Sequence, residues 1–235
     1  MTVCCRLGAS WLFSGLLLCS IPLAAPGDEP GKVRIEFHIQ QDTDLILFSD
    51  FGEPAQCAIW LEDPETHATQ DVFVTRRAGR GEWDGKAECP AALPRWFHVF
   101  ALASGTKGPP TREHPVPDGI SQATPKGDRF SCSVEVAAGR RQIIWVEVNL
   151  SGDYNATFPA ADETSGGIDT DCSGQPSLVY RTEFEAVPGF RVVPELYAYT
   201  VPRTRKGELC RDLAPITTAK EVYPSIEIRV ERPEN

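Results

Sequence analysis

Hydrophobic and polar residues alternate in several short segments of the chain. In the segment 33–39, Val33, Ile35, Phe37 and Ile39 are separated by charged or polar residues. The segments 131–136, 178–186 and 225–231 repeat the pattern. Alternation with a period of two indicates β-strands that turn one face to a core and the other to water.

Denser apolar runs at 58–61, 96–103 and 143–148 predict strands that are more deeply buried, and 71–75 and 192–201 are further candidates. Clusters of Gly, Pro, Asp and Asn separate these segments. Helical periodicity is almost absent, and its best case, 207–222, is interrupted by Pro215 and has room for a turn or two. Eight or nine such strands predict an all-β fold, an Ig-like or fibronectin-III-like β-sandwich.

Two segments are too long to be simple turns. Residues 104–119 contain many glycines and prolines, and residues 151–176 contain several acidic side chains. Loops longer than about 12–15 residues are uncommon in compact domains and often functional. We therefore expect the β-sandwich to carry two long loops.

The first 27 residues have the three parts of a secretory signal peptide. Arg6 is followed by a short apolar run and then by small residues around Ala24 and Gly27, which is the order expected of such a segment. Too many polar and small residues dilute the run for a transmembrane anchor, and Leu18 before Cys19 is not the small residue that a lipoprotein signal needs. We predict a signal peptide at 1–27, a single domain at 28–235, and a periplasmic or secreted location without a stable membrane anchor.

The net charge excludes one class of partner. The whole chain carries a formal charge of −10, and residues 1–27 contain one base and no acid, so the remainder carries 22 − 33 = −11. A surface of this sign repels nucleic acid and anionic lipid.

Five cysteines follow the predicted signal peptide: Cys57, Cys89, Cys132, Cys172 and Cys210. An oxidising compartment permits disulfides among them, and we predict at least one. Because five is odd, at least one thiol is free or pairs with another chain. The spacings contain no Cys-x-x-Cys, which argues against a zinc site.

A short motif closes the first long loop. The run from Asp118 to Thr124 resembles the flavinylation motif of FMN-binding domains, in which an FAD-dependent flavin transferase joins the FMN phosphate to a threonine hydroxyl. The resemblance implies that Thr124 is the covalent FMN acceptor, with Ala123 as its small neighbour and Ser121 and Asp118 as further motif positions. Gln122 departs from the pattern, where the family has Gly. An alternative is ordinary turn chemistry before a strand.

Four stretches of the chain together resemble domain-of-unknown-function family 2271, a family of predicted periplasmic proteins. They are residues 58–63, 118–127, 146–155 and 174–181, in the family's order. The resemblance implies an exported β-sandwich, often encoded beside flavin transferases and membrane redox proteins. It implies no established activity.

The remaining candidates are weaker. Four acids of the second loop could surround a calcium ion, but a solvated acidic loop explains them better: Asp162, Glu163, Asp169 and Asp171. His98 and three tryptophans lie in apolar segments and read as core residues: Trp60, Trp96 and Trp145. No hydrolase motif is present.

Two functions therefore compete. The first is an exported accessory protein that carries or docks a flavin in a redox system, with a flavin transferase or a membrane redox protein as partner. The second is a non-catalytic Ig-like binding or structural module that contacts another protein. The sequence favours a protein that is not an enzyme.

Overall fold

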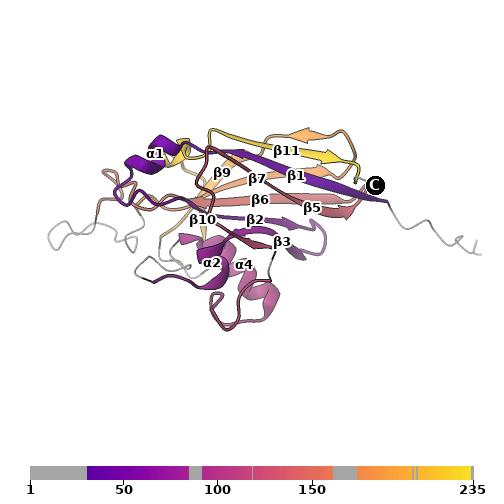
Figure 1. The fold of residues 1–235 in the computed structure, drawn as a ribbon, viewed down its shortest axis with the longest axis horizontal. Helices are drawn as coiled ribbons and strands as arrows, with labels where there is room; N and C mark the ends of the chain where they lie inside the picture. Colours follow the sequence, from indigo (N-terminus) through magenta and orange to yellow (C-terminus); the bar gives the residue numbers. More distant parts are fainter. Residues whose placement is uncertain are drawn as a thin grey trace, which may run out of the picture.

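The structure is a computed structural model that describes residues 31–84, 92–117, 119–160, 174–202, 204 and 206–233. The predicted signal peptide at 1–27 lies outside the described residues. Within them, the chain forms eleven β-strands in two sheets, three short α-helices and one 3-10 helix (Figure 1).

The smaller sheet has four antiparallel strands in the order β5 (Arg129–Ala137), β1 (Lys32–Gln40), β11 (Ser225–Glu231) and β8 (Arg191–Val192). Its strands follow the predicted alternation, since Val33, Ile35 and Phe37 are at most 1% exposed while the residues between them are half-buried. The strands predicted at 33–39, 131–136 and 225–231 are confirmed.

The larger sheet has seven strands. Its order is β10 (Leu209–Cys210), β9 (Glu195–Thr200), β7 (Leu178–Glu185), β6 (Arg141–Asn149), β2 (Gln56–Glu62), β3 (Thr69–Thr75) and β4 (Ser121–Gln122). All neighbours are antiparallel except β3 and β4. The strands predicted at 58–61, 71–75, 143–148 and 178–186 are confirmed, and the one predicted over 192–201 is divided between β8 and β9.

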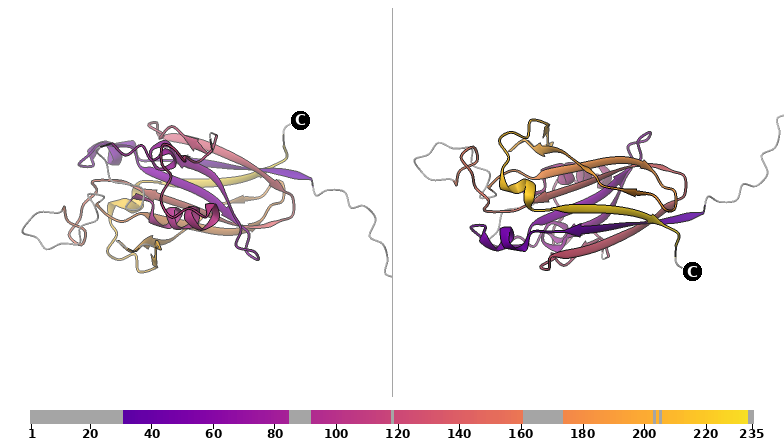
Figure 2. Two further views of the ribbon diagram at one scale, coloured as in Figure 1. Left: turned by 90° about the horizontal axis from the view of Figure 1, so that it is seen from below. Right: turned by 90° about the horizontal axis from the view of Figure 1, so that it is seen from above.

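Two hydrophobic cores hold these layers together. The first lies between the sheets and contains Phe37, Ile59 and Val146. The second lies on the opposite face of the seven-stranded sheet, where Trp60 and Trp145 pack with residues of the helices α2 (Arg76–Arg80) and α4 (Pro94–Ser104). Figures 1 and 2 show α2 and α4 beneath this sheet, whereas α1 (Thr43–Phe48) lies at one end of the molecule.

The predicted all-β, Ig-like or fibronectin-III-like β-sandwich is wrong. The described chain is β-rich, with sheets of four and seven strands and a helical layer against the second of them. The reason is that the larger sheet is apolar on both faces: six consecutive residues of β2, from Gln56 to Leu61, are buried. A second apolar face requires a second cover.

The helix α4 accounts for the largest local error. Residues 96–103, predicted as a buried strand, form a helix that begins with Pro94 and ends before Gly105, whose φ is 67°. A short apolar run has no period that separates a buried strand from a buried helix. The 3-10 helix η1 (Thr218–Glu221) agrees with the turn or two expected within 207–222.

Candidate functional site

A groove of about 520 Å³ lies between the β2–β3 hairpin and helix α4. We call it the hairpin–helix groove. The hairpin supplies one wall and successive turns of α4 supply the other. Its lining residues are Glu62, His67, Ala68, Thr69, Arg95, His98, Val99, Leu102 and Ala103.

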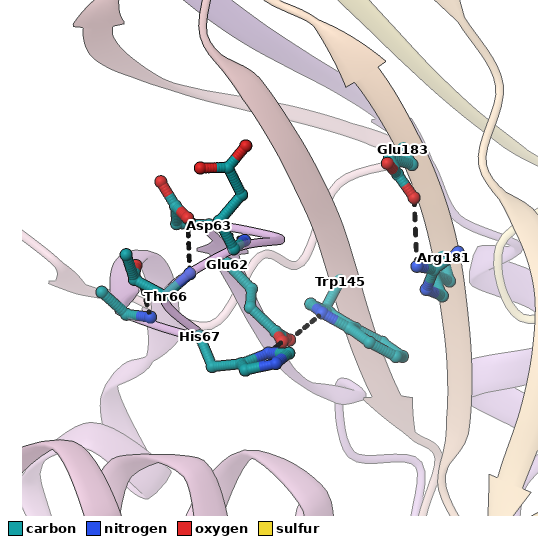
Figure 3. A network of polar contacts seen from close by, with 9 residues as sticks. Glu62, Asp63, Thr66, His67, Trp145, Arg181 and Glu183 are labelled. Carbon is teal, nitrogen blue, oxygen red and sulfur yellow. Dashed lines mark hydrogen bonds and ion pairs between the residues drawn. The ribbon is translucent and has the colours of Figure 1, made fainter.

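The hairpin turn is fixed by local hydrogen bonds. The Asp63 carboxylate accepts the backbone N–H groups of Glu65 and Thr66, each at 2.9 Å. These two hydrogen bonds hold the pKa of Asp63 below its usual range, and the one from Thr66 has the larger effect. His67 follows with φ at 57°, the one non-glycine residue with positive φ in the described part of the chain. This conformation places His67 Nδ1 2.7 Å from Glu62 Oε1 (Figure 3).

Glu62 links the groove to the outer face of the seven-stranded sheet. Its Oε2 accepts a hydrogen bond from Trp145 Nε1 at 2.8 Å, while its Oε1 contacts His67 (Figure 3). The indole of Trp145 stacks on that of Trp60, with ring centroids 6.0 Å apart and an interplanar angle of 9°.

Arginine side chains alternate with aromatic rings along this face. The guanidinium of Arg95 lies 5.8 Å from the Trp145 ring centroid, and that of Arg181 lies 5.4 Å from Trp145 and 5.8 Å from Tyr197. Arg211 lies 4.5 Å from the Tyr197 ring. We call Arg95, Trp145, Arg181, Tyr197 and Arg211 the arginine–aromatic row; Arg95 belongs to the row and to the groove.

Strand register builds the centre of the row. Trp60 on β2 pairs with Trp145 on β6, and Trp145 pairs with Arg181 on β7. Residues paired across neighbouring strands present their side chains on one face. The three residues therefore form a line across the sheet, which Tyr197 of β9 extends.

A buried carboxylate positions Arg95. Leu93 precedes α4 and provides no side-chain cap. Instead, Glu147 of β6 accepts the backbone N–H of Trp96 at 2.6 Å, that of Arg95 at 3.2 Å, and the Ser177 hydroxyl at 2.6 Å. Burial raises the pKa of Glu147 to about 7. A carboxylate at a helix N-terminus satisfies N–H groups that lack partners within the helix.

The chemistry of this face suits noncovalent recognition of anions. Arginine presents a fork of N–H donors to carboxylate or phosphate. The Nε atom of Arg95 is buried and has no hydrogen-bond partner among the described residues. Nor do those residues contain a cluster of three or more His, Cys, Asp or Glu side chains suited to a metal ion.

The predicted flavin loop includes the strand β4, which forms the edge of the seven-stranded sheet on the side opposite β9 and β10. Ser121 belongs to β4, which pairs with β3; Ala123 is exposed and Thr124 is half-buried. Asp118 lies outside the described residues. A cavity of about 430 Å³ is lined by Ile46, Leu47, Pro54, Pro125 and Lys126 among others, and thus reaches the residue that follows Thr124 in the chain. The motif and the arginine–aromatic row are separate surfaces.

Gln122 carries no backbone strain in this loop. It lies in the short strand β4, and it is not among the positions with positive φ. Its side-chain amide donates to the carbonyl oxygen of Gly119 at 3.1 Å. The family's Gly at this position is therefore not required by the backbone of this chain.

Other sequence predictions have mixed outcomes. The described cysteines Cys57, Cys132 and Cys210 are free, whereas Cys89 and Cys172 lie outside the described residues, as do the four acids of the proposed calcium loop. Burial raises the pKa of Cys132 to about 12. The three tryptophans are core residues as predicted, at 0–7% exposure. His98 was predicted to lie in the core, but it is a half-buried residue of the hairpin–helix groove. Its pKa is lowered mainly by burial and further by the positive charges of Arg95 and Lys206.

Sequence reasoning missed the arginine–aromatic row. A signal was present for part of it: Trp145 and Arg181 occupy predicted strands, and both face outward from the first core. Arg95 and Arg211 lie in segments whose structure was predicted wrongly or left open.

Comparisons with known proteins add little. No family model and no curated protein matches the chain. Among solved structures, 89% of the chain is similar to 16% of human GIVD cytosolic phospholipase A2, with 6% identity and a TM-score of 0.25. The similarity is too low to support an argument about function.

No helix in the described ranges is long and apolar enough to cross a membrane.

Proposed function

We propose that the protein is an exported, non-catalytic binding protein that holds an acidic segment of another protein against the arginine–aromatic row. The observation that supports this is the placement of three guanidinium groups on two aromatic rings within a chain of net charge −10. An acidic partner is repelled by most of the surface and attracted at the row, which confines it to one place.

The residue types favour a protein partner. Trp, Tyr and Arg dominate the energetically important positions of protein interfaces, because they combine apolar area with directed hydrogen bonds. The adjoining groove adds apolar surface, since Leu102 on α4 is 72% exposed. An extended segment with carboxylates beside an apolar residue would match the row and the groove together.

The test uses a fluorescein-labelled peptide that is rich in glutamate and contains two phenylalanines. We expect fluorescence anisotropy to show binding that weakens as salt is added, because salt screens exposed charges. Arg181→Ala should weaken binding about tenfold, the effect of one charged hydrogen bond. The matched control is Arg191→Ala, an exposed arginine of the four-stranded sheet whose side chain is 64% exposed. An equal loss in both variants, or equal binding of a lysine-rich peptide, would exclude the row as the site.

A second function has its own support. We propose that Thr124 carries FMN in an extracytoplasmic redox system, as the resemblance to flavinylated domains implies. The unstrained backbone of Gln122, the exposed Ala123 and the cavity beside Pro125 favour this proposal.

Intact mass decides this second proposal. Protein co-expressed with an active FAD-dependent flavin transferase should gain the mass of FMN minus water, and Thr124→Ala should abolish the gain. Thr111→Ala, on the preceding loop, is the control that should retain it. An unmodified mass beside an active transferase would exclude the flavin function and leave the first proposal unaffected.

A further inference from the structure

The four outer edges of the two sheets are unequal. Three are formed by strands of two residues: β8 in the four-stranded sheet and β4 and β10 in the seven-stranded sheet. The fourth is β5, with nine residues. Very short edge strands prevent sheets from pairing with other chains, because they present few free backbone groups. The strand β5 lacks this protection.

Two other protective features, prolines and bulges, are also missing from β5. It contains no proline, and its nine residue pairs with β1 show no shift in register. In the seven-stranded sheet, β3 and β9 have only a two-residue strand on their outer side. Each also pairs with its inner neighbour through a shift in register, at Ile59/Trp60 in the β2–β3 pair and at Val179/Tyr180 in the β7–β9 pair. Bulges and prolines normally block unwanted pairing at edges. A long, regular edge is ready to receive another strand.

The direction of each backbone group in β5 follows from two hydrogen bonds. Just beyond its ends, Ala138 N–H donates to Gly31 C=O, and Gln41 N–H donates to Asp128 C=O. Successive residues of a strand turn their N–H and C=O groups to opposite sides. The even-numbered residues therefore face β1, and the odd-numbered ones face away from it. In the described part of the chain, β5 pairs with β1 alone.

The odd-numbered residues, whose backbone groups face away from β1, also have side chains that complement one another. Arg129, Ser131, Ser133 and Glu135 are exposed, and they are arranged symmetrically about Cys132. We propose that β5 pairs antiparallel with β5 of a second copy of this chain, across a two-fold axis at Cys132, so that two four-stranded sheets join into one of eight strands. Arg129 then lies opposite Glu135 of the second copy, which also contacts Lys32 of its own chain at 3.3 Å, and Ser131 lies opposite Ser133.

The alternative register lacks this match. An axis at Ser133 would place Arg129 opposite Ala137 and Glu135 opposite Ser131, with no pair of opposite charges. In the register centred on Cys132, Ser131 and Ser133 of the two copies exchange backbone hydrogen bonds, because both are odd-numbered. The N–H of Ser133 is thus a donor in the dimer, and no described residue of its own chain accepts it.

Sedimentation equilibrium of the purified protein tests the proposal. We expect a reversible monomer–dimer equilibrium. Ser133→Pro removes the outward N–H and leaves the β1 ladder intact, a placement that edge strands tolerate. It should weaken dimerisation by about tenfold or more, because each dimer loses two hydrogen bonds. Ser133→Ala is the matched control and should dimerise like the wild type. Circular dichroism and the melting temperature establish that both variants fold.

A charge exchange provides a second arm that does not depend on proline. Arg129→Glu alone should weaken the dimer by placing carboxylates opposite each other, and adding Glu135→Arg should restore it. The restoration is specific to this register. A wild-type protein that stays monomeric, a Ser133→Pro variant that dimerises like Ser133→Ala, or a double variant that remains as weak as Arg129→Glu would each overturn the proposal.

Discussion

The two sheets of this protein share a core but differ in what covers their other faces. The outer face of the four-stranded sheet meets solvent, and its charges pair with one another, as in Arg229 with Glu227 at 2.9 Å and Lys32 with Glu135 at 3.3 Å. The outer face of the seven-stranded sheet is covered in part by helices, and beside them it carries arginines that stack on aromatic rings.

The two faces differ in what chiefly holds their arginines, which is an acidic side chain for Arg229 and an aromatic ring for Arg181 and Arg211. Exposed ion pairs contribute little to stability, because water and salt screen them. In the row, the rings fix the positions of the guanidinium groups, and their remaining donors stay available where one of them contacts an acid, as Arg181 Nη2 contacts Glu183 Oε2 at 3.5 Å (Figure 3). The three predictions below concern the helical cover of the seven-stranded sheet, the buried carboxylates and the β2–β3 hairpin, and the loss of stability that each expects decreases in order.

The largest expected effect concerns the second core. Trp96→Ala should lower the free energy of unfolding by about 3–5 kcal/mol, because a fully buried tryptophan leaves a cavity, and its indole N–H also donates to Asp71 at 2.9 Å. Urea denaturation measures the loss. Hydrogen exchange should then accelerate most in α4. The control Leu102→Ala removes an exposed side chain of the same helix and should change stability by less than about 0.5 kcal/mol. A similar loss in both variants would mean that α4 is not anchored through Trp96.

The next prediction concerns pH. Burial raises the pKa of Asp153 to about 8 and that of Glu147 to about 7. Because the folded state then holds protons that the unfolded state releases, the free energy of unfolding should fall as pH rises from about 4 to about 8, by a few kcal/mol at most. In the four-stranded sheet, Arg229 lowers the pKa of Glu227, so its contribution has the opposite sign and is lost in acid.

Urea midpoints measured across this range provide the test. Asp153→Asn should flatten the alkaline part of the profile, whereas the control Asp44→Asn, on the exposed first turn of α1, should leave the profile unchanged. An unchanged profile in Asp153→Asn would show that its burial does not control its ionisation.

The smallest effect belongs to the hairpin turn. His67→Gly should change the free energy of unfolding by no more than about 0.5–1 kcal/mol, because relief of the left-handed conformation offsets the added freedom of the unfolded chain. The lost contact with Glu62 is exposed and worth little. Thr66→Gly, where φ is not positive, should be the more destabilising of the two. Thermal melting compares them, and the reverse order would assign the Glu62–His67 contact a structural role.

The sequence predicted the four-stranded sheet well because only one of its faces is buried. Val33, Ile35 and Phe37 alternate with Arg34 and Glu36, and this period is visible without knowledge of neighbours. In β2 and β6, both faces are buried. Their apolar runs therefore predicted buried strands, but they did not predict that helices cover one of the two faces. Pro94 and Gly105 mark the ends of α4, and they are the signals that periodicity does not use.

The site was less predictable. The arginine–aromatic row depends on which residue of β6 faces which residue of β7, and Arg95 reaches it from a helix. Long-range register is not encoded in any single segment. The surface position of Ala123 was predictable from its turn residues, whereas the chemical state of Thr124 stays a prediction.

The pairing of β1 with β11 has a consequence for folding order. Arg34 pairs with Glu231, at a sequence separation of 231 − 34 = 197 positions. Contacts this distant in sequence make folding slow, because a long loop must close before they form. A chain that crosses a membrane from its N-terminal end cannot complete the four-stranded sheet until β11 has emerged. For a chain exported as proposed above, Phe37 and Ile39 of β1 lack their partners on β11 until then, which leaves an apolar segment for a chaperone to bind.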